Sequence, residues 1–171
     1  MVIKGLIDED FINYKKPSMV IMFPHCTFKC EKDCGQQVCQ NSTLAKSPDI
    51  TISMKELCTR YLSNFISQAI VCGGLEPMDS FDDLISLILT LRYEHQCNDD
   101  IVIYTGYTER ECMLRGWLDE LKHINNIIVK FGRYTPNQQP HFDEVLGVNL
   151  ASDNQYAKLV SEQEADVDGR M

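Results

Sequence analysis

The sequence lacks the features that mark several large classes of protein. None of its apolar runs approaches the roughly 20 residues that a membrane-spanning helix needs. Its first sixteen residues carry acidic side chains and no apolar core of the kind found in a secretory signal peptide. Basic residues are few, with 16 Lys and Arg against 25 Asp and Glu, and the formal net charge is −9. We therefore expect a cytoplasmic protein with no membrane or nucleic-acid partner, because phosphate binding depends on Lys and Arg.

Internal repeats and low-complexity stretches are also missing. The 171 residues suffice for one domain with a real core but are few for two. The apolar fraction of 44% and the charged fraction of 24% are typical of a globular protein. We expect a single domain over residues 1–160, followed by an acidic and flexible tail over residues 161–171.

Cysteine is the residue type present in excess, with eight in the chain. Four of them, Cys26, Cys30, Cys34 and Cys39, lie within fourteen residues. In a cytosolic protein such a cluster indicates a metal or catalytic site before it indicates disulfides. The gaps of three, three and four residues include no Cys-x2-Cys pair of the usual structural zinc type, although one metal bound by all four stays open. A cubane iron–sulfur cluster held by only three thiolates would leave one iron free for a small molecule.

From residue 18 onward, short apolar runs alternate with segments of helical periodicity. The pattern predicts strands at residues 19–23, 69–72, 101–104 and 127–131, and helices at residues 54–66, from residue 80 onward and at residues 109–121. Apolar strands without alternation are typical of a parallel sheet covered by helices. We therefore predict an α/β fold with a mainly parallel sheet. Four or five strand–helix units are too few for a closed barrel of eight, so we expect an open, partial barrel.

Three loops of unusual composition each follow a predicted strand. They are the cysteine cluster, the turn that contains Gly73, Gly74 and Glu76, and the turn that contains Thr105. In parallel folds ligands bind at the carboxyl ends of the strands, so we expect these loops to converge there. The glycine pair permits close backbone approach to a ligand, and the Glu76 carboxylate suits an ammonium group. Taken alone, the glycine turn is better explained as an ordinary connection between a strand and a helix, and the turn that contains Thr105 could equally be one.

Together these motifs resemble the radical S-adenosylmethionine superfamily, and within it the activating protein of the anaerobic, class III ribonucleotide reductase. The resemblance covers roughly residues 12–155. It rests on the Cys-x3-Cys pair, the Cys-x-Asn-Ser-Thr element of residues 39–43, the glycine turn, the Tyr-Thr-Gly-Tyr-Thr string of residues 104–108 and the ending at residues 149–155.

The resemblance implies three cysteine ligands for a [4Fe–4S] cluster, and Cys26 and Cys30 match the first two. The spacing usual in the superfamily would place the third at position 33, which is Asp33 here. We prefer Cys39 as the third ligand, because an Asn-Ser-Thr triplet follows it as in the family, and Cys34 is the alternative. The polar insertion that then precedes Cys39 is easily accommodated in a surface loop.

The same resemblance implies an oxidoreductase that generates a glycyl radical on the reductase, with flavodoxin or ferredoxin as the electron donor. S-adenosylmethionine would bind the open iron and be cleaved to methionine and a 5′-deoxyadenosyl radical. The residues that we expect to bind this cofactor are Gly73, Gly74, Glu76, Thr105 and Asn154, with Phe28 and Val38 as candidates for packing on the adenine. Two alternatives stay open: a radical enzyme with another protein or peptide substrate, and an iron–sulfur or zinc module without catalysis.

Overall fold

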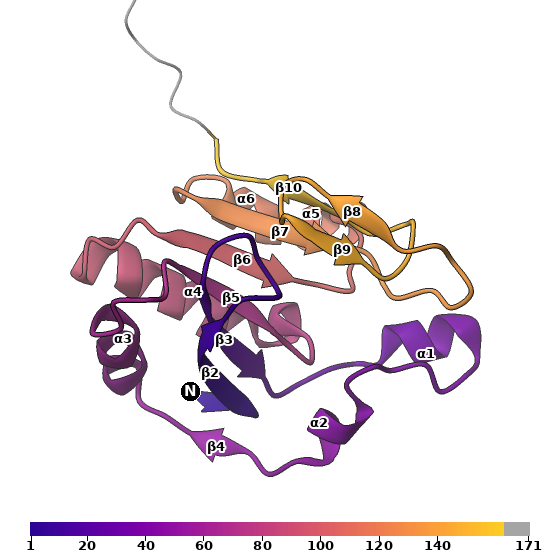
Figure 1. The fold of residues 1–171 in the computed structure, drawn as a ribbon, viewed down its shortest axis with the longest axis horizontal. Helices are drawn as coiled ribbons and strands as arrows, with labels where there is room; N and C mark the ends of the chain where they lie inside the picture. The colour runs from indigo at the N-terminus through magenta and orange to yellow at the C-terminus, as the bar shows by residue number, and fades with distance from the viewer. Residues whose placement is uncertain (163–171) are drawn as a thin grey trace, which may run out of the picture.

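A computed structural model describes residues 1–162 as an α/β fold built on one sheet of six strands (Figure 1). The strand order is β10-β7-β6-β5-β3-β2. The bounds are β2 Gly5–Asp10, β3 Ser18–Phe23, β5 Ala69–Gly74, β6 Asp100–Tyr104, β7 Ile127–Phe131 and β10 Tyr156–Leu159. The four inner strands are parallel to one another, and the two edge strands are antiparallel to their neighbours. The predicted α/β fold and mainly parallel sheet are confirmed.

The inner strands are apolar without alternation because both of their faces are covered. One face contributes Ile21, Ile70 and Ile103 to the larger apolar core, which lies beneath the helices. The other face contributes Val71 and Val102 to a smaller core that the C-terminal segment completes. All four strands predicted from the sequence coincide with these inner strands.

The helices over the larger core are α3 Met54–Leu62, α4 Phe81–Leu89, α5 Glu109–Leu114 and α6 Trp117–Leu121. A 3₁₀ turn, Pro77–Ser80, precedes α4, and a π-helical turn, Thr90–Glu94, follows it. Helix α3 begins where the sequence predicts, because the Ser53 hydroxyl accepts a hydrogen bond from Glu56 N at 3.1 Å. The prediction of one helix over residues 109–121 is wrong. Gly116 adopts a left-handed backbone with a φ of 77° and divides that segment into α5 and α6.

Several short elements leave no clear pattern in the sequence. They are the paired strands β1 Val2–Ile3 and β4 Ile50–Thr51, the paired strands β8 His141–Asp143 and β9 Val148–Leu150, and the helices α1 Lys29–Cys34 and α2 Ser42–Lys46. Elements of two to six residues are too short to display a strand or helix period. Helices α1 and α2 belong to the cysteine loop and extend to one side of the sheet, away from α3 (Figure 1).

Most of the predicted tail, residues 163–171, lies outside the described residues. Ser161, the first residue of the predicted tail, is bonded to the domain. Its hydroxyl donates a hydrogen bond to Ile124 O at 2.6 Å and accepts one from Ile127 N at 2.8 Å. Over residues 1–162, none of the helices has both the length and the apolar character that crossing a membrane requires.

Candidate functional site

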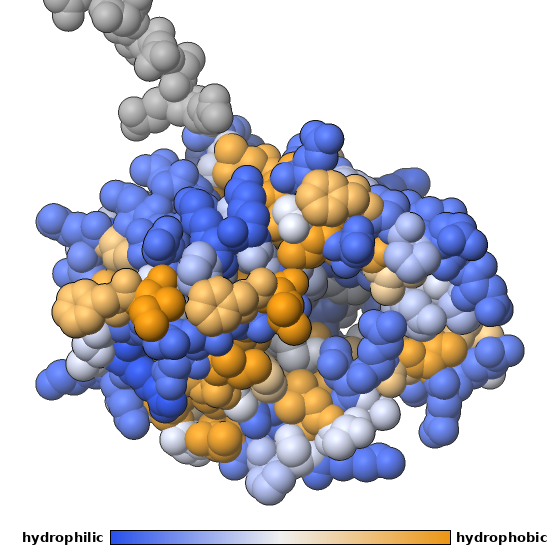
Figure 2. Space-filling model, viewed as in Figure 1, coloured by the Kyte–Doolittle hydropathy of each residue, from blue (hydrophilic) through white to orange (hydrophobic). Residues whose placement is uncertain are grey.

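A cavity of about 470 Å³ lies at the carboxyl end of the parallel strands. Its floor is a layer of residues from four neighbouring strands: Met22, Gly73, Tyr104 and Lys130. Met22 lies opposite Gly73 in the sheet, and Tyr104 lies opposite Lys130. Figure 2 shows the surface hollowed between the α1–α2 segment and the sheet. The volume is in the range that small-molecule sites occupy, and the position is the one expected for ligands of a parallel fold.

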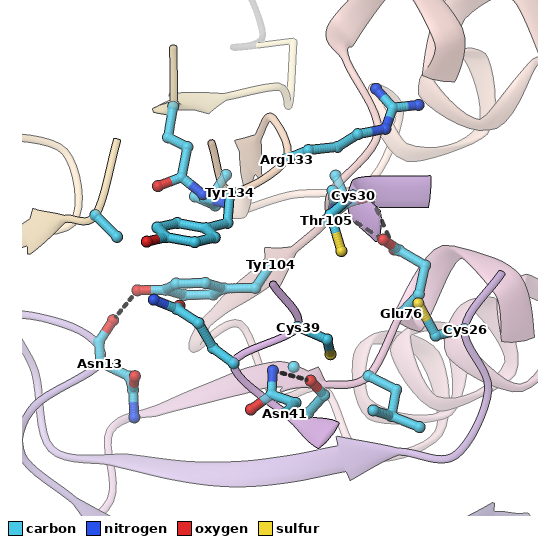
Figure 3. Close-up of a pocket in the computed structure, with 18 of the residues that line it drawn as sticks. Asn13, Cys26, Cys30, Cys39, Asn41, Glu76, Tyr104, Thr105, Arg133 and Tyr134 are labelled. Atoms are coloured by element: carbon cyan, nitrogen blue, oxygen red, sulfur yellow. Dashed lines mark hydrogen bonds between the residues drawn. The ribbon is translucent and has the colours of Figure 1, made fainter. Parts of the chain in front are cut away.

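Three of the four clustered cysteines, Cys26, Cys30 and Cys39, line this cavity. Figure 3 shows their side chains directed toward the same space. The Sγ atom of Cys34, in contrast, lies 3.6 Å from the backbone oxygen of Gln36, and Cys34 is not part of the cavity wall. The structure therefore brings together the three cysteines that the sequence favours and leaves the fourth aside.

The backbone around the cysteines places each thiol. Phe28 has a left-handed φ of 52°, which turns the chain between Cys26 and α1, and its N–H donates to Cys26 Sγ at 3.2 Å. Cys30 lies in α1, and the carboxylate of Glu31 accepts a hydrogen bond from Cys39 N at 3.2 Å. Helix α1 thus carries Cys30 and, through Glu31, also bonds to the backbone of Cys39.

The electrostatic surroundings of Cys26 and Cys30 favour the protonated thiol in the absence of a metal. Burial raises the pKa of Cys26 to about 11, and the negative charge of Glu76 adds to the effect. Burial also raises the pKa of Cys30, and a negative charge on the neighbouring Cys39 raises that pKa further. Such thiols ionise when a cationic centre binds them, because the metal charge compensates the thiolates.

Within residues 1–162, no three His, Cys, Asp or Glu side chains stand close enough together to hold a single metal ion. A cubane cluster accepts each thiolate on a different iron, so its ligands stand farther apart than those of one ion. Three thiols on the wall of an open cavity fit such a cluster better than they fit a structural zinc ion, which is enclosed by four ligands.

Ion pairs tie the cysteine loop to the body of the protein. Arg133 follows β7, and its guanidinium contacts Glu111 of α5 at 2.6 Å and Asp33 of α1 at 3.1 Å. Lys29, also of α1, reaches Glu111 at 3.3 Å. The hydrogen bond from Arg133 is the main reason that the pKa of Glu111 falls to about 2. A carboxylate that stays ionised thus links two cations, one from each side of the cavity.

Glu76 and Thr105, both predicted to bind a cofactor, lie in the cavity wall and bond to each other. The Thr105 hydroxyl donates to Glu76 Oε1 at 2.8 Å, and Gly106 N donates to Oε2 at 2.8 Å. Met78 N also donates to Oε1, at 3.1 Å. The carboxylate is buried, and this burial raises its pKa to about 7 from the ordinary 4.5. Glu76 therefore joins the loops after β5 and β6, in addition to facing the cavity.

We expect the substitution Glu76→Gln to change how stability depends on pH. The folded chain holds the Glu76 proton up to about pH 7, whereas the unfolded chain releases it near pH 4.5. The wild-type protein should therefore lose on the order of 3 kcal/mol of unfolding free energy as the pH rises through this window, and the glutamine variant should not. Urea unfolding of both proteins at several pH values measures the difference. If the free energy of unfolding changed with pH in the same way in both proteins, the result would contradict the burial of the Glu76 carboxylate.

Asn41 is a site residue that the sequence analysis did not identify as one. Its side-chain amide donates to the backbone oxygen of Gly74 at 2.7 Å and so links the cysteine loop to the glycine turn (Figure 3). The sequence does contain an indication of this role, because Asn41 lies two residues after Cys39 in the Cys-x-Asn-Ser-Thr element. Other wall residues that no motif indicated as ligand-binding are Asn13, Lys29, Lys130, Arg133 and Tyr134.

Not every predicted residue reaches the cavity. Gly73, Gly74 and Val38 line it, but Phe28 and Asn154 do not. Phe28 instead lines a separate hollow beside α1. Asn154 donates its side-chain amide to Arg133 O at 2.8 Å and supports the wall from behind.

Comparison with protein families shows which family the chain matches. The family model described as a 4Fe-4S single cluster domain matches residues 18–156. Neither the comparison with curated proteins nor the comparison with solved structures found a match. The matched segment begins with the first residue of β3 and ends with the first residue of β10, so it contains the cysteine loop, the parallel strands and most of the residues that line the cavity. The chain belongs to the 4Fe-4S single cluster domain family.

Proposed function

We propose that this protein is an enzyme that uses a [4Fe–4S] cluster to cleave S-adenosylmethionine and generate a glycyl radical on a partner protein. Cys26, Cys30 and Cys39 would hold the cluster. The observation that carries the proposal is that three thiols, and not four, face a cavity with room for a ligand. When bound and reduced, the cluster would supply one electron to the sulfonium of S-adenosylmethionine, whose cleavage would give methionine and a 5′-deoxyadenosyl radical.

The chain itself contributes positioning. Gly73 carries no side chain on the cavity floor, so a ligand can approach the backbone closely there, and Gly74, with a φ of +81°, turns the chain at the carboxyl end of β5. The hydrogen bonds among Glu76, Thr105 and Gly106 hold the next turn in place. A preorganised wall of this kind keeps the reacting groups in one geometry and excludes water from them.

Apolar and aromatic side chains offer a place for the adenosine. Val38 lines the cavity, as do Tyr104 and Tyr134. Figure 3 shows the ring of Tyr134 lying above that of Tyr104. Flat aromatic faces suit a nucleobase, so these two tyrosines take the role that the sequence analysis gave to Phe28.

The arrangement also supports an open, partial barrel. The helices of the larger core cover one face of the sheet, and the cavity lies on the other face, where the carboxyl ends of the strands are accessible. Ile7 and Ile12 line the cavity and are 38% and 76% exposed, so its rim is apolar. An apolar rim suits a polypeptide substrate better than a small polar one. The substrate that we propose is the glycine loop of a class III ribonucleotide reductase, and flavodoxin or ferredoxin is the proposed electron donor.

Anaerobic reconstitution with iron and sulfide tests the proposed function. We expect about four irons per chain and, on addition of a reductant, release of 5′-deoxyadenosine from S-adenosylmethionine. With a class III reductase present, electron paramagnetic resonance should detect a glycyl radical on that partner. Bound zinc without cleavage would contradict the proposed enzyme, and cleavage without a radical on the reductase would contradict the proposed substrate.

A further inference from the structure

Five exposed apolar side chains form a surface beside the mouth of the cavity. They come from the edge strand β2 (Ile7), from the loop between β2 and β3 (Phe11 and Ile12) and from the loop between α3 and β5 (Phe65 and Ile66). We call these five residues the apolar strip. Figure 2 shows apolar side chains in a row across this side of the molecule, ending at the hollow. Apolar residues exposed singly are ordinary, but a gathered set of them marks an interaction site.

Hydrogen bonds join the parts of the strip. The side-chain amide of Asn64 donates to the backbone oxygen of Asp8 at 3.1 Å, and the Ser67 hydroxyl donates to the same oxygen at 2.6 Å. The loop between α3 and β5 is therefore bonded to β2 at the residue after Ile7. Strand β2 ends at Asp10, where the loop to β3 begins. Both loops thus lie at the same end of β2.

A polar side chain holds each loop in one conformation. Asn64 Oδ1 accepts a hydrogen bond from Ile66 N at 2.8 Å. Asp10 Oδ2 accepts hydrogen bonds from Ile12 N at 3.2 Å and from Asn13 N at 2.9 Å. Asn and Asp side chains stabilise turns in this way. An ordered backbone therefore presents the apolar side chains to solvent, which reduces the entropy that is lost when a partner covers them.

The strip is continuous with the cavity. Ile7 and Ile12 line the cavity, whereas Phe11, Phe65 and Ile66 are outside its wall. A molecule that covers the whole strip therefore also lies over the mouth of the cavity. A small molecule held within the cavity leaves the three outer residues uncovered. A protein that inserts one of its own segments into the cavity covers both surfaces at once.

The charge of the chain favours a different protein over a second copy as the occupant. Each copy has a formal net charge of −9, so two copies repel each other. Glu9 of β2 is exposed and has no cation within ion-pair distance in residues 1–162, whereas its neighbour Asp8 is paired with Arg60 at 2.6 Å. In a symmetric dimer the same patch meets itself, so two Glu9 carboxylates would enter one interface. The surface therefore fits a partner that presents a Lys or Arg beside apolar side chains.

We propose that the apolar strip is the docking surface for the protein on which the glycyl radical is generated. The inference rests on the proposed function, because it concerns the partner of the same site. The rings of Phe11 and Phe65 pack against apolar side chains of the partner, and a basic residue of the partner pairs with Glu9. The strip thereby holds the partner in the orientation in which its glycine segment enters the cavity past Ile7 and Ile12.

Anaerobic binding of the reconstituted protein to a class III reductase, measured by biolayer interferometry, tests the docking surface. We expect Phe11→Ser and Phe65→Ser together to weaken binding by about 30-fold or more, because exposed aromatic residues dominate the binding energy of interfaces. Leu114→Ser is the matched control and should bind as wild type, since Leu114 is 78% exposed on α5, which lies across the sheet from β2 (Figure 1). Neither phenylalanine lines the cavity, so release of 5′-deoxyadenosine without the reductase should stay within about 2-fold of wild type.

The substitution Glu9→Lys tests the charge that we assign to the partner. It should slow association with the reductase by about 3-fold or more at low salt, and the effect should shrink as the salt concentration rises. Unchanged or faster association would overturn the basic chemistry proposed for the partner.

The outcomes separate the docking surface from the proposed function. Wild-type affinity of the double phenylalanine variant for the reductase would overturn the docking surface and leave the proposed function intact. A wild-type dimer that becomes monomeric in the double variant, with unchanged radical formation, would show that a second copy covers the strip. If the wild-type protein releases 5′-deoxyadenosine but does not bind the reductase, the proposed partner and the docking surface both fail. If it releases none, the proposed function fails as well.

Hydrogen exchange provides a second test, for which no variant is needed. Addition of the reductase should slow amide exchange at residues 63–68, which are outside the cavity wall, and should leave residues 113–116 unchanged. Protection of the cavity residues without protection of residues 63–68 would place the partner elsewhere and overturn the docking surface.

Discussion

Replacement of Cys39 by alanine is expected to abolish the cluster, whereas replacement of Cys34 by alanine should leave most of it. The two residues are a matched pair, because both are half-buried free cysteines of the same loop. Their side chains point in different directions. Cys39 lines the cavity with Cys26 and Cys30, and its charge raises the pKa of Cys30, which places the two thiols near each other. Cys34 interacts instead with the backbone oxygens of Glu31 and Gln36.

Iron and sulfide content after anaerobic reconstitution measures this difference, together with the visible absorption of the cluster and reductive cleavage of S-adenosylmethionine. The Cys39→Ala variant should give background values in all three, because two thiolates do not hold a cubane stably. The Cys34→Ala variant should stay close to wild type. Loss of the cluster in the Cys34→Ala variant, with retention in the Cys39→Ala variant, would show that the loop rearranges around the metal and would reverse the ligand assignment.

The sequence predicted the parallel strands well because each is a short apolar run closed by a glycine or a polar turn. The segment from Ala69 to Gly74 is an example, since its residues are buried on both faces of the sheet and leave no doubt about the type of element. The convergence of the loops followed from the same pattern, because parallel strands present their carboxyl ends on one edge. The helix break at Gly116 was harder to foresee, since a glycine can stand within a helix as well as end one.

The parts of the site that depend on distant pairing were not predictable from one sequence. Arg133 contacts Asp33 and Glu111, which are far from it in the chain, and nothing in the local sequence indicates which acid it meets. The place of Lys130 in the cavity wall could not be predicted for another reason. In an apolar run a single lysine usually extends its stem to reach water, and its burial shows only when the cavity above the strand is known.

The second large effect is expected from substitution of Gly74, and it concerns the stability of the fold and not the binding of the cluster. Gly74 has a φ of +81°, and a Cβ added there would lie 2.7 Å from the Cα of Met22 and 2.8 Å from its Cβ. These are backbone and near-backbone atoms of β3, which cannot move aside without disrupting the pairing with β5. We therefore expect Gly74→Ala to lower the free energy of unfolding by about 3 kcal/mol or more.

Gly73→Ala is the matched control, because an added Cβ there meets only the Cβ of Tyr104, at an ordinary 3.8 Å. Its free energy of unfolding should stay within about 1 kcal/mol of wild type. The new methyl group would instead project onto the cavity floor, so this variant should lose affinity for S-adenosylmethionine while remaining folded. Urea unfolding followed by circular dichroism, with equilibrium dialysis alongside, separates the two effects. Equal stability of the Gly74→Ala and Gly73→Ala variants would contradict the close packing of Gly74 on β3, and unchanged ligand binding by Gly73→Ala would place the ligand away from that part of the floor.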